Sequence, residues 1–419
     1  MAIVRLALGS VWNRRVTAGL TIAAIALSVT MLLGVEKIRR DARDAFANTI
    51  SGTDLIVGAR SGAVQLLLYS VFRIGNATNN ISWRTYEDIA NLPNVSWAIP
   101  ISLGDSHRGY RVMGTVREYF NRYRYARTES IRFAAGVPFD DVYDAVLGAE
   151  VAEHLGYKLG DEVIIAHGAG EVSFALHDDK PFRVVGILEP TGTPVDRTVH
   201  VSLEGIEAMH VDWKSGARIP GLKISAEQAR HMDLTPKTIT AFLLGLKSKT
   251  AIFKVQRQIN EYREEPLLAI IPGVALQELW DLMSVAEKAL FIVSLMVVVS
   301  GLLGMLTVIL SSLEARRREM AVLRSVGARP LHVLALFVSE AGVLTLLGAL
   351  LGVMLLYGAL LVGQPIAARE FGLHLPIKLL QARDLMILAL VVLAGFIVGI
   401  VPALRAYRLS LADGLSMRI

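Results

Sequence analysis

Long apolar runs divide this chain into two kinds of sequence. Four runs reach the roughly 20 apolar residues that a helix needs to cross a bilayer, and they occupy residues 16–35, 289–313, 331–362 and 385–404. The first two carry no charge, and Glu340 is the one formal charge in the third. A cleaved signal peptide is the alternative for the first run, but the run is too long and no clear cleavage site follows it. We therefore expect four membrane-spanning helices.

Arginines cluster at alternate ends of these four runs. One group precedes the first run, a dense group follows the second, and Arg405, Arg408 and Arg418 follow the fourth. If the runs alternate in direction, all these arginines lie on one side, and the positive-inside rule makes that side cytoplasmic. Residues 36–286 then lie outside the cell or in the periplasm.

Helical periodicity continues past the ends of the first two spans. Apolar residues recur at three- and four-residue steps from Val35 to Ile50, and a matching stretch at 276–288 leads into the second span. This spacing is typical of amphipathic helices, so both ends of the outer region are expected to form a helical stalk. Residues 1–15 have the pattern of an amphipathic helix and are expected to lie on the inner membrane face.

The outer region mixes both kinds of secondary-structure signal. Strands are expected at 110–113, 163–166, 182–188 and 198–201, and helices at 86–92 and 149–155. The predicted fold class is an integral membrane α-helical protein with four transmembrane helices and a large α+β extracytoplasmic domain between the first and second spans.

The same patterns divide the whole chain into nine segments. These are an N-terminal helix at 1–15, the first span and stalk at 16–50, the outer domain at 51–275, the second stalk and span at 276–313, a short cytoplasmic helix at 314–330, the third span at 331–362, an outer loop at 363–384, the fourth span at 385–404 and a cytoplasmic tail at 405–419.

One segment of the outer domain, residues 61–74, is unusually apolar for a region in water. It is too short to span a membrane. It is either a buried helix of the domain or a surface that contacts a substrate, a partner or the membrane interface. In the second case the contact residues are Leu66, Leu67, Leu68, Tyr69 and Phe72.

Composition supports a membrane protein and limits its chemistry. Of the 419 residues, 53% are hydrophobic, and the mean hydropathy is +0.47, which is too apolar for an ordinary soluble enzyme. The chain has no cysteine, which excludes disulfides and thiolate metal sites. The formal net charge of +5 is a weak basic signal.

Histidines are the other candidate metal ligands. Eight of the nine fall on the outer side, at positions 107, 154, 167, 177, 200, 210, 231 and 374. The pairs His177 with Asp178–Asp179 and His210 with Asp212 contain suitable ligand types. Scattered surface histidines are the more common explanation of such a pattern, so the sequence assigns no metal site.

The arginine-rich segment after the second span has the pattern of an amphipathic helix. Five arginines (316, 317, 318, 324 and 329) surround an apolar strip at helical spacing. Gly327 suits a helix end, and Pro330 suits the first turn of the next helix, where its missing N–H costs nothing. A short charged helix between two spans is expected to dock a cytoplasmic partner.

This segment resembles a signature of ABC transporter permeases of the MacB/LolC/FtsX-like family. Residues 318–327, REMAVLRSVG, are similar to the family's R-E-[IM]-x-x-L-R-x-[LIV]-G. Residues 402–415 resemble its C-terminal P-A-x-R-A-x-R-x-x-P-x-x-A-L motif, with Leu411 in place of proline and Gly414 in place of alanine. In the outer domain, 146–161 and 184–188 resemble its recurring pattern, whereas residues 213–240 fit poorly.

The resemblance implies a cytoplasmic coupling helix at 314–330. Its implied ATPase-coupling residues are Arg318, Glu319, Met320, Leu323, Arg324 and Gly327. Glu340 falls where the third span of the family carries an acidic residue. It is either solvated at the membrane boundary or a fixed partner for an arginine of the coupling segment.

The sequence contains no phosphate-binding loop of the form G-x-x-x-x-G-K-[ST]. The resemblance therefore implies that ATP and Mg²⁺ bind a separate ABC ATPase subunit and that this chain is neither an enzyme nor a cofactor-binding protein. It also implies a second permease copy, in a homodimer or a related heterodimer, in a bacterial inner membrane. A periplasmic adaptor or substrate-binding protein and membrane lipids are further candidate partners, and nucleic acid is not.

Glycine pairs at 348/352 and 395/399 would let helices approach closely, as at an interface between two copies, although such pairs also arise by chance in apolar helices.

Two functions fit the resemblance. The first is ATP-driven export or extraction of an amphiphile, a lipid-linked molecule or a peptide, with force transmitted to the outer domain. The second is signalling across the membrane to an outer hydrolase without transport. The full-length outer domain and the stalk favour transport.

Overall fold

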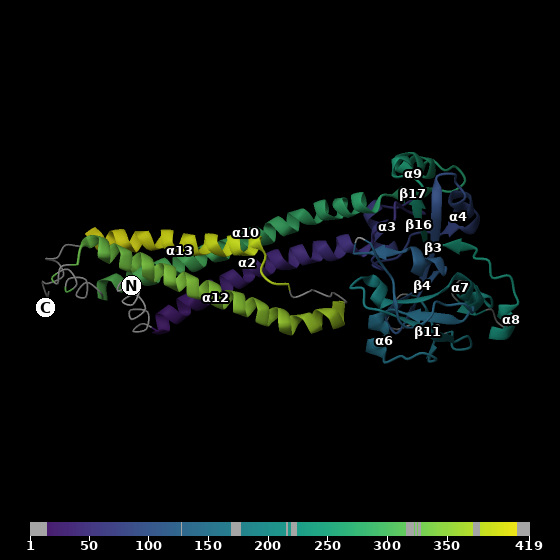
Figure 1. Ribbon diagram of the computed structural model, residues 1–419, viewed down its shortest axis with the longest axis horizontal. Coiled ribbons are helices and arrows are strands. Elements are labelled where there is room, and N and C mark those ends of the chain that lie inside the picture. Colours follow the sequence, from purple (N-terminus) through teal and green to yellow (C-terminus); the bar gives the residue numbers. More distant parts are fainter. Residues whose placement is uncertain are drawn as a thin grey trace. The chain divides into compact units, whose positions relative to one another are not determined.

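The computed structural model describes residues 15–126, 128–168, 177–214, 217–218, 224–315, 322, 325, 328–371 and 378–408. The chain forms two compact units. The membrane unit comprises Met1–Ala42 and Ser284–Ile419, and the outer domain comprises Arg43–Met283. Figure 1 shows long helices in the first and a strand-rich fold in the second.

Four long helices carry the apolar runs: α2 (Arg15–Thr49), α10 (Pro272–Ala315), α12 (Pro330–Phe371) and α13 (Ala382–Arg408). Each contains a stretch long and apolar enough to cross a membrane, which confirms the four predicted spans. Helices α2 and α10 include residues 35–49 and 276–288 without a break, where the periodicity predicted helix. Helix α12 begins at the expected Pro330.

Apolar stripes hold the membrane unit together. On α2, Ile25, Val29 and Leu33 are buried at four-residue steps, and they belong to one cluster with Met305 of α10 and Phe337 of α12. Residues four apart lie on one helix face, so each helix turns a continuous apolar face toward its neighbours.

The outer domain is organised around an eleven-stranded mixed sheet in the order β17-β1-β16-β3-β4-β12-β8-β11-β7, with β10 paired to β3 and β9 to β11. In that order the strands are β17 (Leu267–Ile270), β1 (Leu55–Ala59), β16 (Ala241–Leu246), β3 (Val95–His107), β4 (Tyr110–Thr115), β12 (Thr198–Ser202), β8 (Asp144–Leu147), β11 (Phe182–Leu188), β7 (Phe133–Gly136), β10 (Ala166–His167) and β9 (Glu162–Val163). Pairs β8/β11 and β4/β12 are parallel.

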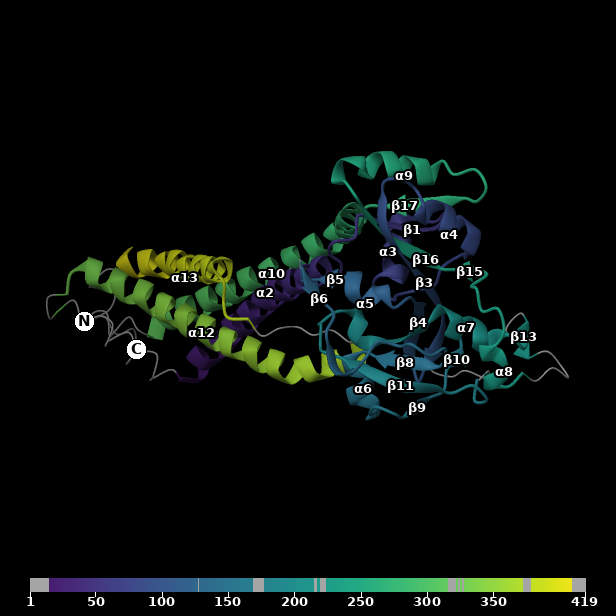
Figure 2. The ribbon, with the colours of Figure 1, turned by 45° about the vertical axis from the view of Figure 1, so that its right-hand side comes forward.

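Short helices and three small two-stranded pairs complete the domain. The helices are α3 (Ala63–Ser70), α4 (Trp83–Ala90), α5 (Glu118–Arg122), α6 (Ala149–Leu155), α7 (Leu203–His210), α8 (Ala226–Arg230) and α9 (Ile252–Asn260), with 3₁₀ turns η1 (Pro194–Arg197) and η2 (Lys249–Ala251). The small pairs are β2 (Ile81–Ser82) with β15 (Thr238–Ile239), β5 (Arg124–Tyr125) with β6 (Glu129–Ser130), and β13 (Trp213–Lys214) with β14 (Ala217–Arg218). In Figure 2, α9 lies against β17 and α7 against β4.

Most of the expected elements of the outer domain are present. Strand β11 and helix α6 have the predicted bounds, 182–188 and 149–155. The single strand expected at 163–166 was wrong, because this segment forms two short strands that pair with different neighbours. Val163 of β9 pairs with Phe182 of β11, whereas Ala166 of β10 pairs with Ser106 of β3.

Candidate functional site

The membrane unit contains Glu340, and its helices are held at close range by small side chains. Gly348 and Gly352 of α12 face α2. A Cβ atom at Gly348 would lie 2.7 Å from the Cβ of Ile25, and one at Gly352 would lie 2.7 Å from the carbonyl oxygen of Ala26. Thr30 of α2 donates a hydrogen bond to the Gly352 carbonyl at 2.9 Å. Only glycine permits this approach.

The second glycine pair acts in the same way between α13 and α12. A Cβ at Gly399 would lie 2.6 Å from that of Ala341, and one at Gly395 would collide with Thr345. Both pairs therefore pack helices of one chain. From the sequence, these glycines were considered only for an interface between two copies.

A group of charged side chains joins three helices at the end of α2 from which the chain continues into the outer domain. Arg40 of α2 binds Asp384 of α13 through both guanidinium nitrogens, at 3.0 and 3.1 Å. Arg383 of α13 lies 3.1 Å from Glu36 of α2. We call the set the ion-pair network; its members are Glu36, Lys37, Arg39, Arg40, Asp41, Glu287, Arg383 and Asp384.

The acidic members of the ion-pair network are paired, and all are buried except Glu287, which is partly buried. Each carboxylate lies within 3.6 Å of a cationic nitrogen. Lys37 and Asp41 are 5% and 3% exposed and form a pair at 3.2 Å. Buried charges are tolerated only when they are paired, and a bidentate arginine also fixes orientation. The network therefore holds α2, α10 and α13 in one register.

The sequence prediction missed this network. Its signal is the run KIRRDARD after the first apolar stretch, together with Arg383 and Asp384 before the fourth. Those charges read as ordinary ends of membrane spans, because the bases and the acids that pair lie far apart in the chain. Arg40 and Asp384 are separated by 344 positions.

Glu340 faces the interior of the membrane unit. It lies in α12, is 6% exposed, and lines a cavity of about 500 Å³ together with Thr17 of α2 and Ser311 and Ser312 of α10. Arg15 lines the same cavity. An ionisable side chain in a span is expected to face such a polar cavity rather than lipid.

The predicted coupling residues fall outside what the structure describes. Arg318, Glu319, Met320, Leu323, Arg324 and Gly327 are all outside the described residues. Within the segment, Val322 and Ser325 are helical and exposed. The coupling assignment therefore rests on the sequence signature.

The apolar segment 61–74 forms α3, which packs on β1 and β17 of the outer domain. Gly58 of β1 makes this possible, since a Cβ there would lie 2.5 Å from Leu66 and 2.6 Å from the Tyr69 hydroxyl. The proposed contact residues are buried or partly buried in the core, namely Leu66, Leu67, Leu68, Tyr69 and Phe72. The buried-helix alternative therefore describes this segment, and burial raises the pKa of Tyr69 to about 12.

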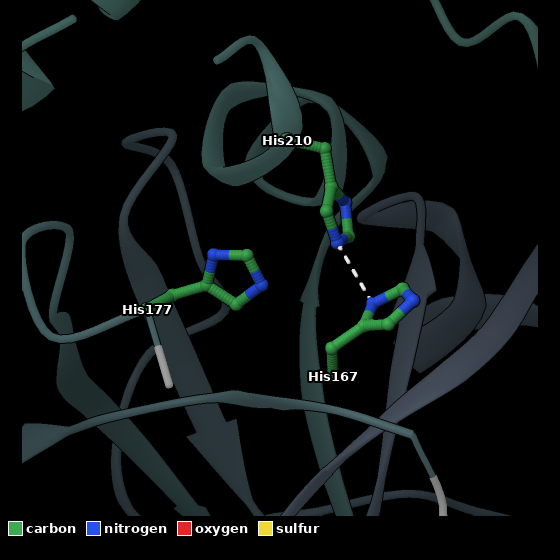
Figure 3. A group of neighbouring side chains, drawn as sticks. All are labelled: His167, His177 and His210. Carbon is green, nitrogen blue, oxygen red and sulfur yellow. Dashed lines mark hydrogen bonds between the residues drawn. The ribbon is translucent and has the colours of Figure 1, made fainter. Parts of the chain in front are cut away.

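Two of the histidines that the sequence considered as metal ligands lie together, but with a different partner. His177 and His210 meet His167, and one ring nitrogen from each lies within 4.8 Å of the others (Figure 3). Asp212, the expected companion of His210, instead binds Lys180 at 2.5 Å in a buried ion pair. Burial, reinforced by the charge of His210, lowers the pKa of His177 to about 4.

Comparison with known families divides the chain as its structure does. Residues 18–262 match the model of the MacB-like periplasmic core domain, and residues 291–411 match that of the FtsX-like permease C-terminal domain.

Two curated relatives carry transport names. The chain is 24% identical to a macrolide export ATP-binding/permease protein MacB of Nitrobacter winogradskyi, over 96% of this chain and 58% of the relative. It is 25% identical to the pyoverdine export ATP-binding/permease protein PvdT of Pseudomonas putida, over 78% of this chain and 47% of the relative. The chain thus spans about half the length of these relatives.

Among solved structures, the periplasmic region of MacB from Actinobacillus actinomycetemcomitans is similar at a TM-score of 0.34 and 11% identity. That match covers 55% of this chain and 94% of that structure.

Proposed function

Because this chain belongs to the MacB/FtsX-like family of ABC transporter permeases, we propose that it couples ATP hydrolysis by an ABC ATPase to movement of its outer domain. The movement exports or extracts an amphiphilic substrate such as a lipid-linked molecule, a peptide or a small amphiphile. The observation that carries the proposal is the succession of a MacB-like periplasmic core domain and an FtsX-like permease domain in one chain.

The order of the spans supports this role. The outer domain is inserted between the first and second candidate spans, and the remaining two follow the arginine-rich segment. The helices that carry the first two spans, α2 and α10, extend without interruption into residues assigned to the outer domain. A continuous helix is a stiff element, so force applied to a span reaches the outer domain through the backbone.

We place ATP and Mg²⁺ on an ABC ATPase outside this sequence. The 419 residues contain no phosphate-binding loop, and the names of the longer relatives, of which the matched segments cover 58% and 47%, join an ATP-binding and a permease function. We assign the chain to the inner membrane of a bacterium with its MacB-like domain in the periplasm. The assembly contains two permease copies.

The coupling helix of this proposal is residues 314–330. Met320 and Leu323 supply apolar anchors for a groove of the ATPase, while Glu319 and Arg324 orient the helix through charged hydrogen bonds. Glu340 lies in the helix that follows and faces the polar cavity. We assign it a role in passing movement from this segment to the spans.

The coupling helix can be tested by truncating its anchors in the full-length chain. Leu323→Ala combined with Glu319→Ala should leave the permease in the membrane but reduce copurification of its ABC ATPase. Loss of one buried anchor costs about 2 kcal/mol, or roughly thirtyfold in affinity. The measurement is the amount of ATPase, and of ATP hydrolysis, that copurifies with the tagged permease from native membranes.

Val322→Ala is the matched control, because this neighbouring apolar side chain is exposed. It should retain the ATPase. If the double variant keeps both the ATPase and its hydrolysis, the segment serves only to orient the spans through its arginines, and the coupling proposal is wrong.

A further inference from the structure

Three histidines of the outer domain converge from separate elements. His167 ends β10, His210 ends α7, and His177 lies ten positions after His167 in the chain. We call these three residues the histidine cluster. Figure 3 shows their imidazole rings turned toward one another, with one ring nitrogen from each within 4.8 Å of the others. Convergence from three elements distinguishes this group from scattered surface histidines.

A carboxylate completes the group. Asp105 of β3 is the cross-strand neighbour of His167 of β10, and it is 4% exposed. Its Oδ1 lies 3.1 Å from Nδ1 of His167 and 3.8 Å from Nε2 of His210. The nearby carboxylate of Asp212 is already bound by Lys180.

His177 is the member whose environment is incomplete. It is fully buried, and both of its ring nitrogens lack a hydrogen-bond partner among the described residues. Its aromatic neighbour Trp213 lies with its ring centre 4.3 Å away. By contrast, His107 is equally buried but has the Ile164 carbonyl at 2.7 Å and the Tyr157 hydroxyl at 3.0 Å. Buried polar groups normally have partners, and a bound ion would supply one to His177.

The separations between the donor atoms fit a tetrahedral metal ion. Zinc binds histidine nitrogen and carboxylate oxygen at about 2.0–2.2 Å, which places neighbouring ligand atoms of a tetrahedron about 3.4 Å apart. Nδ1 of His167 lies 3.3 Å from Nε2 of His210, and the Asp105 distances of 3.1 and 3.8 Å bracket the same value. These three atoms match the spacing of one face of a tetrahedron, and a ring nitrogen of His177 lies within 4.8 Å of those of His167 and His210.

We propose that one Zn²⁺ ion binds between the histidine cluster and the carboxylate of Asp105. Imidazole and carboxylate donors suit a divalent ion of intermediate softness. With four protein ligands the site is closed, so the ion holds β3, β10, α7 and the segment at His177 together without performing catalysis. The proposal does not depend on the transport function, because the site lies wholly within the outer domain.

Zinc binding can be measured on the full-length chain in nanodiscs. The chain is purified through a tag without histidines, stripped with EDTA and returned to chelator-free buffer. It is then titrated with Zn²⁺ against a chromophoric chelator of known affinity. We expect one high-affinity ion per chain. His167→Ala and His210→Ala should each weaken binding by at least about tenfold.

Two further measurements guard against misfolding and identify the geometry. Because His177 is buried, the effect of His177→Gln on zinc binding is interpreted only together with the effects of substitutions at His167 and His210, which are partly exposed. Cobalt(II) in place of zinc should give the intense visible absorption of four-coordinate Co²⁺. Asp105→Asn should weaken that absorption if the carboxylate is a ligand.

His231→Ala is the control, because this exposed outer-domain histidine pairs with Glu227 and is not part of the cluster. It should bind zinc as the unaltered chain does. The proposal is overturned if the unaltered chain binds no stoichiometric zinc, or if replacing all three cluster histidines leaves its affinity unchanged.

Discussion

The ion-pair network of the membrane unit and the histidine cluster of the outer domain are both groups of buried polar side chains, but they differ in how their charges and lone pairs are satisfied. In the network, each carboxylate has a cation within 3.6 Å. In the cluster, His167 and His210 share the carboxylate of Asp105, and His177 has no hydrogen-bond partner for either nitrogen among the described residues.

The difference separates two uses of buried polarity. A set of charges whose carboxylates all have cations within the protein serves to fix helices against one another. A group whose ligand atoms converge, and whose hydrogen-bond partners are incomplete, can bind an external ion. Stability measurements distinguish the two groups. Removing one member of the ion-pair network should cost much folding free energy, whereas removing one member of the histidine cluster should cost little unless its ion is bound.

The largest effect is expected at the bidentate pair of the network. Arg40→Met leaves Asp384 buried without its cation, and breaking a buried pair typically costs about 3–5 kcal/mol. The full-length chain in nanodiscs should therefore unfold at a clearly lower temperature. Adding Asp384→Asn removes the stranded charge and keeps an oxygen that can accept the Gln381 N–H, so the double variant should recover much of the loss.

Equal melting temperatures for the single and double variants would contradict this account. They would show that the guanidinium contributes through its packing rather than through its charge.

A smaller effect is expected from histidines of the outer domain when EDTA is present. His107→Leu strands the Ile164 carbonyl and the Tyr157 hydroxyl, which should cost about 1–3 kcal/mol. His177→Leu removes no hydrogen bond that the structure records, so its cost should stay below about 1 kcal/mol. Thermal unfolding of both variants gives the comparison. If His177→Leu is as damaging as His107→Leu, His177 already has its partner within the protein.

The smallest effect is expected at an exposed ion pair. Arg84 and Glu264 lie 3.8 Å apart with side chains 79% and 62% exposed. Arg84→Ala should change stability by less than about 1 kcal/mol, and added salt should erase the difference. A loss comparable to that of Arg40→Met would show that burial does not set the scale of these interactions.

The sequence was sufficient for features that depend on local pattern. Span length and helix periodicity are properties of neighbouring residues, so the four spans, the start of α12 at Pro330 and the bounds of β11 and α6 were predictable. The motifs at 318–327 and 402–415 were enough to predict the family.

Long-range pairing was not predictable in the same way. His210 and Asp212 were grouped because they are two positions apart in the sequence. In the structure, Asp212 forms an ion pair with Lys180, and His210 contacts His167. Strands β10 and β3 pair with each other, although His167 and Asp105 in this pair are 62 positions apart in the chain. Similarly, the apolar α3 looked ambiguous until Gly58 showed where it packs.

The pair between Arg40 and Asp384 places a constraint on how such a protein evolves. Thr30 of α2 is fixed against the Gly352 carbonyl, and ten positions later Arg40 must meet Asp384. Inserting one residue between them would turn Arg40 by about 100° around the helix and move it about 1.5 Å along the axis. The guanidinium would then point away from its carboxylate. A longer first span could still fit the bilayer by tilting. The number of residues between Thr30 and Arg40 is therefore set by the direction in which Arg40 must point around the helix. This segment can change by substitution, but not by insertion or deletion.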